Sequence, residues 1–259
     1  MPTKSVRVIE RAVEVLDVVR ACGGSAGVSE ISKQIDLPKS TVHRILIALA
    51  NTGLLRKDEA ADRYSLGYKA LELAFAASKQ WDLISIAMPY LQSLRDETGD
   101  TATLGLRVGQ QRFVDVAWAS GRSALRWTPT LGEEYPLHWG ALGKAILAFQ
   151  FDQEIDEYLS VPSLPAATPR TIVDPVALRA DLKLIRERGY AVSFGEHVEG
   201  AAGVAAPIRA RDGRSYAAVC VTGLASRFNE SDLGGLCAAV VKAARAIGVA
   251  CQFIAVDGR

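Results

Sequence analysis

Three segments in the first 50 residues carry apolar residues at the spacing of a helix. In the first, apolar side chains recur every three or four positions with charged residues between them: Val8, Ile9, Ala12, Val13, Leu16 and Val19. This pattern predicts an amphipathic helix of roughly four turns that buries this set of side chains. Cys22-Gly23-Gly24-Ser25 then ends the helix.

Two further helices are predicted behind turns. Ser29 is a good N-cap for a short helix that stops near Ile35. Asp36-Leu37-Pro38 forms the next turn, where Pro38 suits the first position of a helix because its missing N–H costs nothing there. The third helix ends at Thr52-Gly53 and turns four apolar side chains inward: Val42, Ile45, Leu46 and Leu49.

A β-hairpin follows the third helix. Leu54–Lys57 and Arg63–Leu66 each favour a short strand, and the polar residues 58–62 between them form a charged tip. Three short helices followed by a hairpin is the element order of a winged helix-turn-helix domain. The alternative is a helical bundle that binds no ligand.

The outer side of the third helix has the chemistry of a DNA-reading surface. Its N-terminal end carries donors and acceptors that suit base edges or phosphates: Lys39, Ser40, Thr41, His43 and Arg44. The wing and the basic lead-in add cations that would meet the DNA backbone: Arg56, Lys57, Arg63, Lys4 and Arg7. Between residues 37 and 57 there is no acidic residue. We therefore predict that this domain binds double-stranded DNA with its third helix in the major groove.

Charge is distributed unevenly, although the whole chain is almost neutral. Of 259 residues, 30 are Lys or Arg and 29 are Asp or Glu, a net charge of +1. Residues 1–80 contain 12 basic and 9 acidic residues (net +3), whereas residues 81–259 contain 18 and 20 (net −2). Near-neutrality argues against a protein that coats nucleic acid or an anionic membrane, so the local basic stretch is the informative feature. The 49% of hydrophobic residues excludes a disordered chain.

Cysteine usage and the N-terminal sequence favour a cytoplasmic protein. The four cysteines form no CxxC pair, and their mostly apolar surroundings favour buried thiols over disulfides or zinc ligands: Cys22, Cys220, Cys237 and Cys251. The first 16 residues lack the uninterrupted apolar stretch of a signal peptide. No window of about 18 uncharged apolar residues suggests a membrane span.

A strongly apolar segment joins the two halves of the chain. Residues 67–81 are rich in strong helix formers and apolar over much of the helix circumference. Such a helix needs a packing partner, either within this chain or in a second copy. We divide the chain into a winged helix-turn-helix domain (1–66), a linker helix (67–81) and a C-terminal domain (82–259).

The C-terminal domain mixes helices and strands. Helices are predicted at 82–98, 141–149, 152–158, 175–188 and 232–248, and strands at 101–108, 112–118, 125–128, 190–196, 204–210 and 215–222. Short connections at Gly109-Gln110-Gln111 and Asp212-Gly213 predict hairpins and hence antiparallel pairing. The predicted fold class is α+β with a mainly antiparallel sheet, not a doubly wound sheet.

Catalytic motifs are largely missing. Gly143-Lys144 resembles the end of a P-loop, but His138 stands where that loop needs a glycine, and Ala145 replaces its Ser or Thr. There is no G-x-S-x-G elbow and no HExxH motif. Glu196 and His197 are adjacent in a predicted strand, so they should point to opposite faces and share no target. We expect no catalytic residue, no metal site and no cofactor.

Two sets of motifs resemble the IclR family of bacterial transcriptional regulators. The first comprises LPKSTVHRIL (37–46), GLL (53–55) and YSLG (64–67). The second comprises YPLH (135–138), GKAILA (143–148), RGYA (188–191) and AAPI (205–208), so the matches span nearly the whole chain. The resemblance implies a winged-helix DNA-binding domain that dimerises close to the linker helix. It also implies a GAF-like effector-binding domain that assembles dimers into tetramers.

The resemblance further implies an effector pocket in the C-terminal domain. Carried over position by position, and with Trp139 added on chemical grounds, its lining is Trp127, Tyr135, Trp139, Ala141, Leu142, Ser193, Gly203, Cys220 and Thr222. Small residues on one wall and aromatic rings on another suit a flat ligand, although the rings would equally suit an ordinary core. Hydroxyl groups, and the backbone N–H groups at 140–143 where a helix opens, suit a carboxylate.

Three positions depart from the family pattern. These are Trp139-Gly140 before the GK pair, Phe194-Gly195 where acidic residues are common, and Gly203 where Cys or Ser is common. The lost polar groups argue against the small hydroxy- and keto-acids that the family binds.

Two functions from different classes remain open on the sequence. The favoured one is a ligand-responsive repressor that binds a palindromic operator as a homodimer or tetramer and senses a small organic acid, aromatic or otherwise flat. The alternative is an enzyme of small acids behind a helical interaction domain, which the pocket and Cys220 suggest. The lack of a recognisable catalytic base argues against the enzyme.

Overall fold

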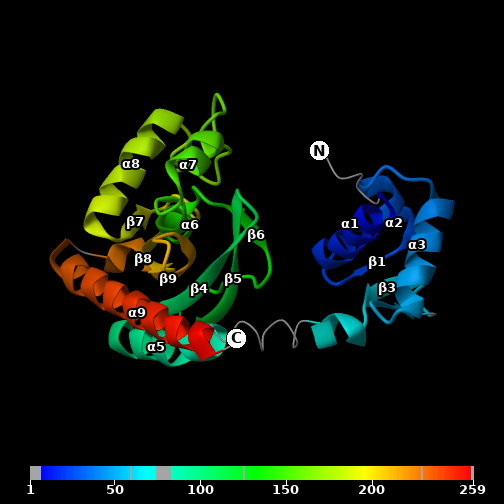
Figure 1. Ribbon diagram of the computed structural model, residues 1–259, viewed down its shortest axis with the longest axis horizontal. Coiled ribbons are helices and arrows are strands. Elements are labelled where there is room, and N and C mark those ends of the chain that lie inside the picture. The colour runs from blue at the N-terminus through cyan, green and yellow to red at the C-terminus, as the bar shows by residue number, and fades with distance from the viewer. Residues whose placement is uncertain (1–6, 59, 74–82, 125, 229, 258–259) are drawn as a thin grey trace. The chain divides into compact units, whose positions relative to one another are not determined.

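The computed structural model describes residues 7–58, 60–73, 83–124, 126–228 and 230–257 of the chain. The chain divides into two compact units, Met1–Trp81 and Asp82–Arg259, which are described separately (Figure 1).

The N-terminal unit combines three helices with a small antiparallel sheet. Its helices are α1 (Arg7–Ala21), α2 (Val28–Gln34) and α3 (Lys39–Asn51), and its strands are β1 (Ser25–Ala26), β2 (Leu55–Asp58) and β3 (Arg63–Leu66). Strand β3 pairs with β2 to form the wing and with the two-residue β1 on its other side. This is a winged helix-turn-helix fold, in which α2 begins just before the predicted cap Ser29 and is capped by Gly27.

The buried side of α1 differs from the predicted one. Its buried side chains are Val15, Val18 and Val19, which pack with the cores of α2 and α3. By contrast, three side chains that we predicted to be buried are largely exposed: Val8 (71%), Ile9 (62%) and Val13 (50%). Because α1 carries apolar residues around most of its circumference, periodicity alone did not identify the face that packs inward.

Part of the predicted linker helix can be described. Residues 68–73 are helical, and their large apolar side chains Tyr68, Leu71 and Leu73 are exposed. The rest of the predicted linker, like the lead-in residue Lys4, lies outside the described residues.

The C-terminal unit is built on a six-stranded sheet in which every pair of neighbours is antiparallel. The strand order is β6-β5-β4-β9-β8-β7. The strands are β4 (Thr101–Val108), β5 (Arg112–Ala119), β6 (Glu134–Pro136), β7 (Ala191–Phe194), β8 (Ala201–Arg209) and β9 (Ser215–Leu224). The fold is therefore α+β, as predicted.

Helices cover both faces of this sheet (Figure 1). Helices α5 (Leu83–Thr98) and α9 (Glu230–Asp257) lie side by side on one face, where they pack on side chains such as Leu104, Val219 and Val221. Helices α6 (Gly140–Leu147), α7 (Asp152–Tyr158) and α8 (Pro175–Arg188) lie on the other, around Phe113, Ala218 and Cys220. Successive strand residues thus contribute to two separate cores.

Helix α9 is long and apolar. Residues Leu233–Cys251 satisfy the length and hydropathy of a membrane-crossing helix. In this fold, however, Val240, Ala244 and Ile247 are buried in the core that α9 shares with α5 and the sheet.

Two strand predictions were wrong. Residues 126–130 have no regular secondary structure, whereas β6 was not predicted because three residues are too short to show an alternating pattern. Strand β7 ends at Phe194, where Gly195 takes a left-handed φ of 69°. Glu196 and His197 therefore lie in a loop, so the alternation that we applied to them does not hold.

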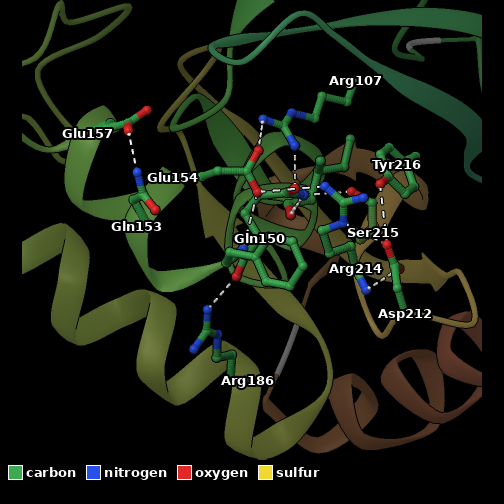
Figure 2. Close-up of polar contacts among 12 residues, drawn as sticks. Arg107, Gln150, Gln153, Glu154, Glu157, Arg186, Asp212, Arg214, Ser215 and Tyr216 are labelled. Atoms are coloured by element: carbon green, nitrogen blue, oxygen red, sulfur yellow. Dashed lines mark hydrogen bonds and ion pairs between the residues drawn. The ribbon is translucent and has the colours of Figure 1, made fainter.

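A buried polar network holds α6 and α7 against one end of the sheet (Figure 2). Arg107, at the end of β4, donates to the side chains of Gln150 and Glu154, the latter at 2.7 Å. Gln150 in turn donates to the carbonyl groups of Ile146 (2.7 Å) and Ser215 (2.6 Å). Arg186 from α8 donates to the carbonyl of Gln150 at 2.7 Å. Because the partners come from distant segments, the network fixes the chain between α6 and α7.

Candidate functional site

The first candidate site is the exposed side of α3. Every side chain that we predicted to contact DNA from this helix is exposed: Lys39, Ser40, Thr41, His43 and Arg44. Val42, Leu46 and Leu49, which alternate with them at helical spacing, are buried in the core of the unit. The helix thus presents a strip of donors and acceptors to solvent while its apolar side holds it in place.

The wing and the start of α1 add further cations. Arg7 is exposed. Arg56 and Lys57 are also exposed; Arg56 makes a 2.9 Å hydrogen bond to Ser65, and Lys57 forms a 3.2 Å ion pair with Asp62. Arg63 differs because it donates inward, to the Ser25 carbonyl at 2.7 Å and to Glu30 at 3.1 Å. Arg63 thereby ties β3 to β1 and α2, a structural role that its position in the sequence did not reveal.

The second candidate site is a pocket between the sheet and the start of α6. Its cavity volume is about 50 Å³, below the ~300–1,000 Å³ typical of small-molecule sites, and it opens to solvent, so a ring-sized ligand would have to extend into the mouth or part the walls. Eight of the nine predicted effector residues line it: Trp127, Trp139, Ala141, Leu142, Ser193, Gly203, Cys220 and Thr222. Tyr135 does not line the pocket, but its ring packs edge-on against His197, which does.

His197 is the centre of the aromatic wall. The centroid of its ring lies 4.6 Å from that of Tyr135, 5.5 Å from Trp139 and 5.9 Å from Trp127. Burial lowers the pKa of His197, so its imidazole is neutral at pH 7 and offers one donor and one acceptor. Sequence reasoning missed this residue because it placed residues 190–196 in one strand.

The opposite wall is polar, and its thiol is unreactive. It includes Thr103, Thr222 and Cys220, whose sulfur lies 3.3 Å from the Thr222 hydroxyl. Burial raises the pKa of the Cys220 thiol to about 12, so the thiol stays protonated and is a poor nucleophile. Among the described residues, no group of three or more His, Cys, Asp or Glu could hold a metal ion.

Helix α6 opens into the pocket with its N-terminus. Gly140, Ala141 and Leu142 line the pocket, and the N-cap Trp139 makes no capping hydrogen bond with its side chain. The indole N–H of Trp139 donates instead to the Pro165 carbonyl at 3.0 Å. The first-turn N–H groups and the helix dipole therefore favour a negatively charged group here.

The GK lysine lies behind the pocket. Lys144 is 1% exposed and donates to Asp181 of α8 and to Glu196, each at 2.8 Å. Burial raises the pKa of Glu196, while the Lys144 ammonium acts in the opposite direction. Lys144 thus joins α6, α8 and the loop that carries His197.

The pocket holds carboxyl groups but no cation. Asp115 and Glu196 line it, whereas no Lys or Arg is among the described residues that do so. Sequence reasoning missed Asp115, although it is an acidic residue among the buried positions of β5. An acidic residue at a buried strand position is the sequence signal that could have identified it.

The fold and the exposed α3 define a winged helix-turn-helix transcriptional regulator. Two family models match the chain: the IclR helix-turn-helix domain over residues 8–59, and the bacterial transcriptional regulator IclR C-terminal domain over residues 75–249. The protein belongs to the IclR family.

Known proteins resemble this chain in sequence and structure along most of its length. The HTH-type transcriptional regulator BhcR of Paracoccus denitrificans is 32% identical over 93% of this chain and 85% of its own. The crystal structure of an IclR transcriptional regulator from Silicibacter sp. TM1040 superposes with a TM-score of 0.87 at 26% identity, covering 94% of this chain and 96% of that one. An IclR homologue from Microbacterium hydrocarbonoxydans, complexed with 4-hydroxybenzoate, gives a TM-score of 0.81 at 25% identity, with coverages of 95% and 99%. These relatives are regulators, so the family assigns this protein to regulation and not to enzymatic catalysis.

Proposed function

We propose that this protein is a ligand-responsive repressor that works in the cytoplasm. Its winged helix binds a palindromic operator, and its C-terminal pocket binds a small aromatic acid that shifts the balance between DNA-competent and incompetent states. The observation that carries the proposal is the division of α3 into a buried apolar side and an exposed strip that includes Arg44.

The proposed DNA contacts follow from exposure and chemistry. Lys39, Ser40, Thr41, His43 and Arg44 would meet base edges and phosphates in the major groove. Arg7, Arg56 and Lys57 would meet the backbone. Arg63 would contact DNA only by leaving or sharing its bonds to Ser25 and Glu30, so we expect its loss to affect folding more than binding.

A second copy of the chain would give the operator its symmetry. Val8, Ile9 and Val13 form an exposed apolar strip on α1, and such strips are commonly covered by a partner. A homodimer that covers the strip would set two α3 helices about one helical turn of DNA, or a multiple of it, apart. Dimers of this kind would pair further into tetramers.

Arg44→Ala tests the DNA assignment. The wild-type protein is first used to select its operator from random duplexes, and affinity for that sequence is then measured by fluorescence anisotropy. Removing a guanine or phosphate contact should weaken binding by about 1–3 kcal/mol, or roughly five- to 150-fold.

Arg179→Ala is the matched control, because Arg179 is an exposed arginine on α8 and its loss changes the net charge equally. Equal affinities of the Arg44→Ala and Arg179→Ala variants would reject the assignment of Arg44 as a DNA contact. Failure of the wild-type protein to select any sequence would reject the function itself.

The effector proposal rests on two features of the pocket, the start of α6 and the aromatic side chains. The carboxylate would bind the uncapped N–H groups of α6 beside Ser193, and a ring would lie among Trp127, Trp139 and His197. The 4-hydroxybenzoate in the Microbacterium relative, which has the same fold, supports a ligand of this kind.

A further inference from the structure

Asp115 has a buried carboxyl oxygen that makes no hydrogen bond to the residues that the structure describes. Its residue is 4% exposed, it points into the pocket from β5, and within the part of the chain that the structure describes its Oδ1 atom has no hydrogen-bond partner. Nearly all buried polar atoms in native proteins are paired, because an unpaired one loses its bonds to water without replacement. An exception that faces a ligand pocket points to a partner on the ligand.

The groups around Asp115 do not neutralise it. Tyr135 faces it from β6 and Cys220 from β9, while Glu196 and His197 lie across the pocket. Gly105, opposite Asp115 on β4, has no side chain. None of these groups is a cation at neutral pH, and burial raises the pKa of Asp115 to about 7. The carboxyl therefore resists ionisation and favours a neutral partner over an ammonium group.

Asp115 and Ser193 lie on different strands of the same pocket. In the strand order β6-β5-β4-β9-β8-β7, Asp115 is on β5, whereas Ser193 is on β7. The first turn of α6 reaches across the pocket: a Cβ atom added to Gly140 would be 3.7 Å from the Ser193 hydroxyl, and one added to Gly105, opposite Asp115, would lie within 3 Å of the Leu142 side chain. A ligand that binds its acid at the start of α6 thus lies in the pocket that Asp115 lines.

We infer that Asp115 selects the effector by binding a hydroxyl group on its ring. This inference rests on the proposed function of the pocket and names the class of ligand: a hydroxylated aromatic acid. A hydroxyl group donates to the carboxylate form of Asp115 and accepts from its protonated form, so it satisfies the side chain in either state.

The experiment measures ligand selectivity by isothermal titration calorimetry. The probes are the three hydroxybenzoate isomers, the three methylbenzoates that match them in shape, and 4-methylphenol. The wild-type protein should bind one hydroxybenzoate at least about tenfold more tightly than its methyl counterpart. Asp115→Leu should abolish or reverse that preference, whereas Glu157→Gln, which removes an exposed acid from α7, should leave it unchanged.

The unliganded protein supplies a second measurement. If Asp115 serves the ligand, Asp115→Leu and Asp115→Asn should raise the melting temperature of the free protein by at least about 2 °C, because they remove an unsatisfied buried acid. If Asp115 had a purely structural role, replacing it would instead lower the melting temperature of the free protein. That result would overturn the inference.

The outcomes separate the two proposals. Equal binding of hydroxy- and methylbenzoates would overturn the role of Asp115 and keep the acid effector. Binding of 4-methylphenol alone, lost in Asp115→Leu, would support Asp115 and refute the acid. No binding of any hydroxylated probe would overturn both.

Discussion

Replacing Asp115 by Asn should remove a pH dependence from the stability of the C-terminal unit. Burial raises the pKa of Asp115 from 3.8 to about 7 in the folded protein. Between these values the folded protein holds a proton that the unfolded chain has released. The folded state is therefore fully favoured below pH 4 and loses that advantage as the pH rises to 7. Three pKa units at 1.36 kcal/mol each correspond to up to about 4 kcal/mol.

Urea unfolding of the wild-type protein and of Asp115→Asn at pH 5 and pH 8 measures this difference. Tryptophan fluorescence follows the relevant unit, since Trp118, Trp127 and Trp139 all lie in it. Other buried groups, such as Glu196 and His197, titrate in both proteins, so their contribution cancels in the comparison. If the two proteins lose the same free energy of unfolding from pH 5 to pH 8, within about 0.5 kcal/mol, Asp115 is not the buried acid described above.

Two further substitutions test the packing that positions the pocket. Arg107→Ala should lower the free energy of unfolding by about 1–3 kcal/mol, since it removes the guanidinium bonds to Gln150 and Glu154; urea unfolding would contradict this if stability stayed within error of wild type. Gly143→Ala should cost about 1–3 kcal/mol, because the added Cβ would lie 2.5 Å from the Leu137 carbonyl oxygen and 2.8 Å from the Phe113 ring; an unchanged melting curve would show that α6 can shift to make room.

Local pattern predicted most of the secondary structure. The bounds of α7 and α8 matched, because Asp174 and Gly189 around α8 are strong start and stop signals. The exposed strip on α3 was likewise predictable, since its polar residues alternate with buried ones at helical spacing. Both cases depend on residues close together in the chain.

Features set by distant contacts were not predictable. Val15 and Val18 of α1, not Val8 and Val13, face the core, a choice made by where α2 and α3 pack. The position of Asp115 became informative only once α6 was known to form the other wall of its pocket. Similarly, the GK pair resembled a phosphate loop, but Lys144 is enclosed by Asp181 and Glu196, which are 37 and 52 residues away.

The two faces of the sheet belong to two different cores, and this affects which substitutions could alter the proposed ligand specificity. On β9, Val219 and Val221 belong to the core under α5 and α9, whereas Cys220 and Thr222 face the pocket. A substitution at one position thus alters ligand recognition while its immediate neighbours keep the helical layer on the far face intact. A combinatorial library confined to every second strand residue would therefore vary the proposed effector specificity while leaving the side chains of the far core in place.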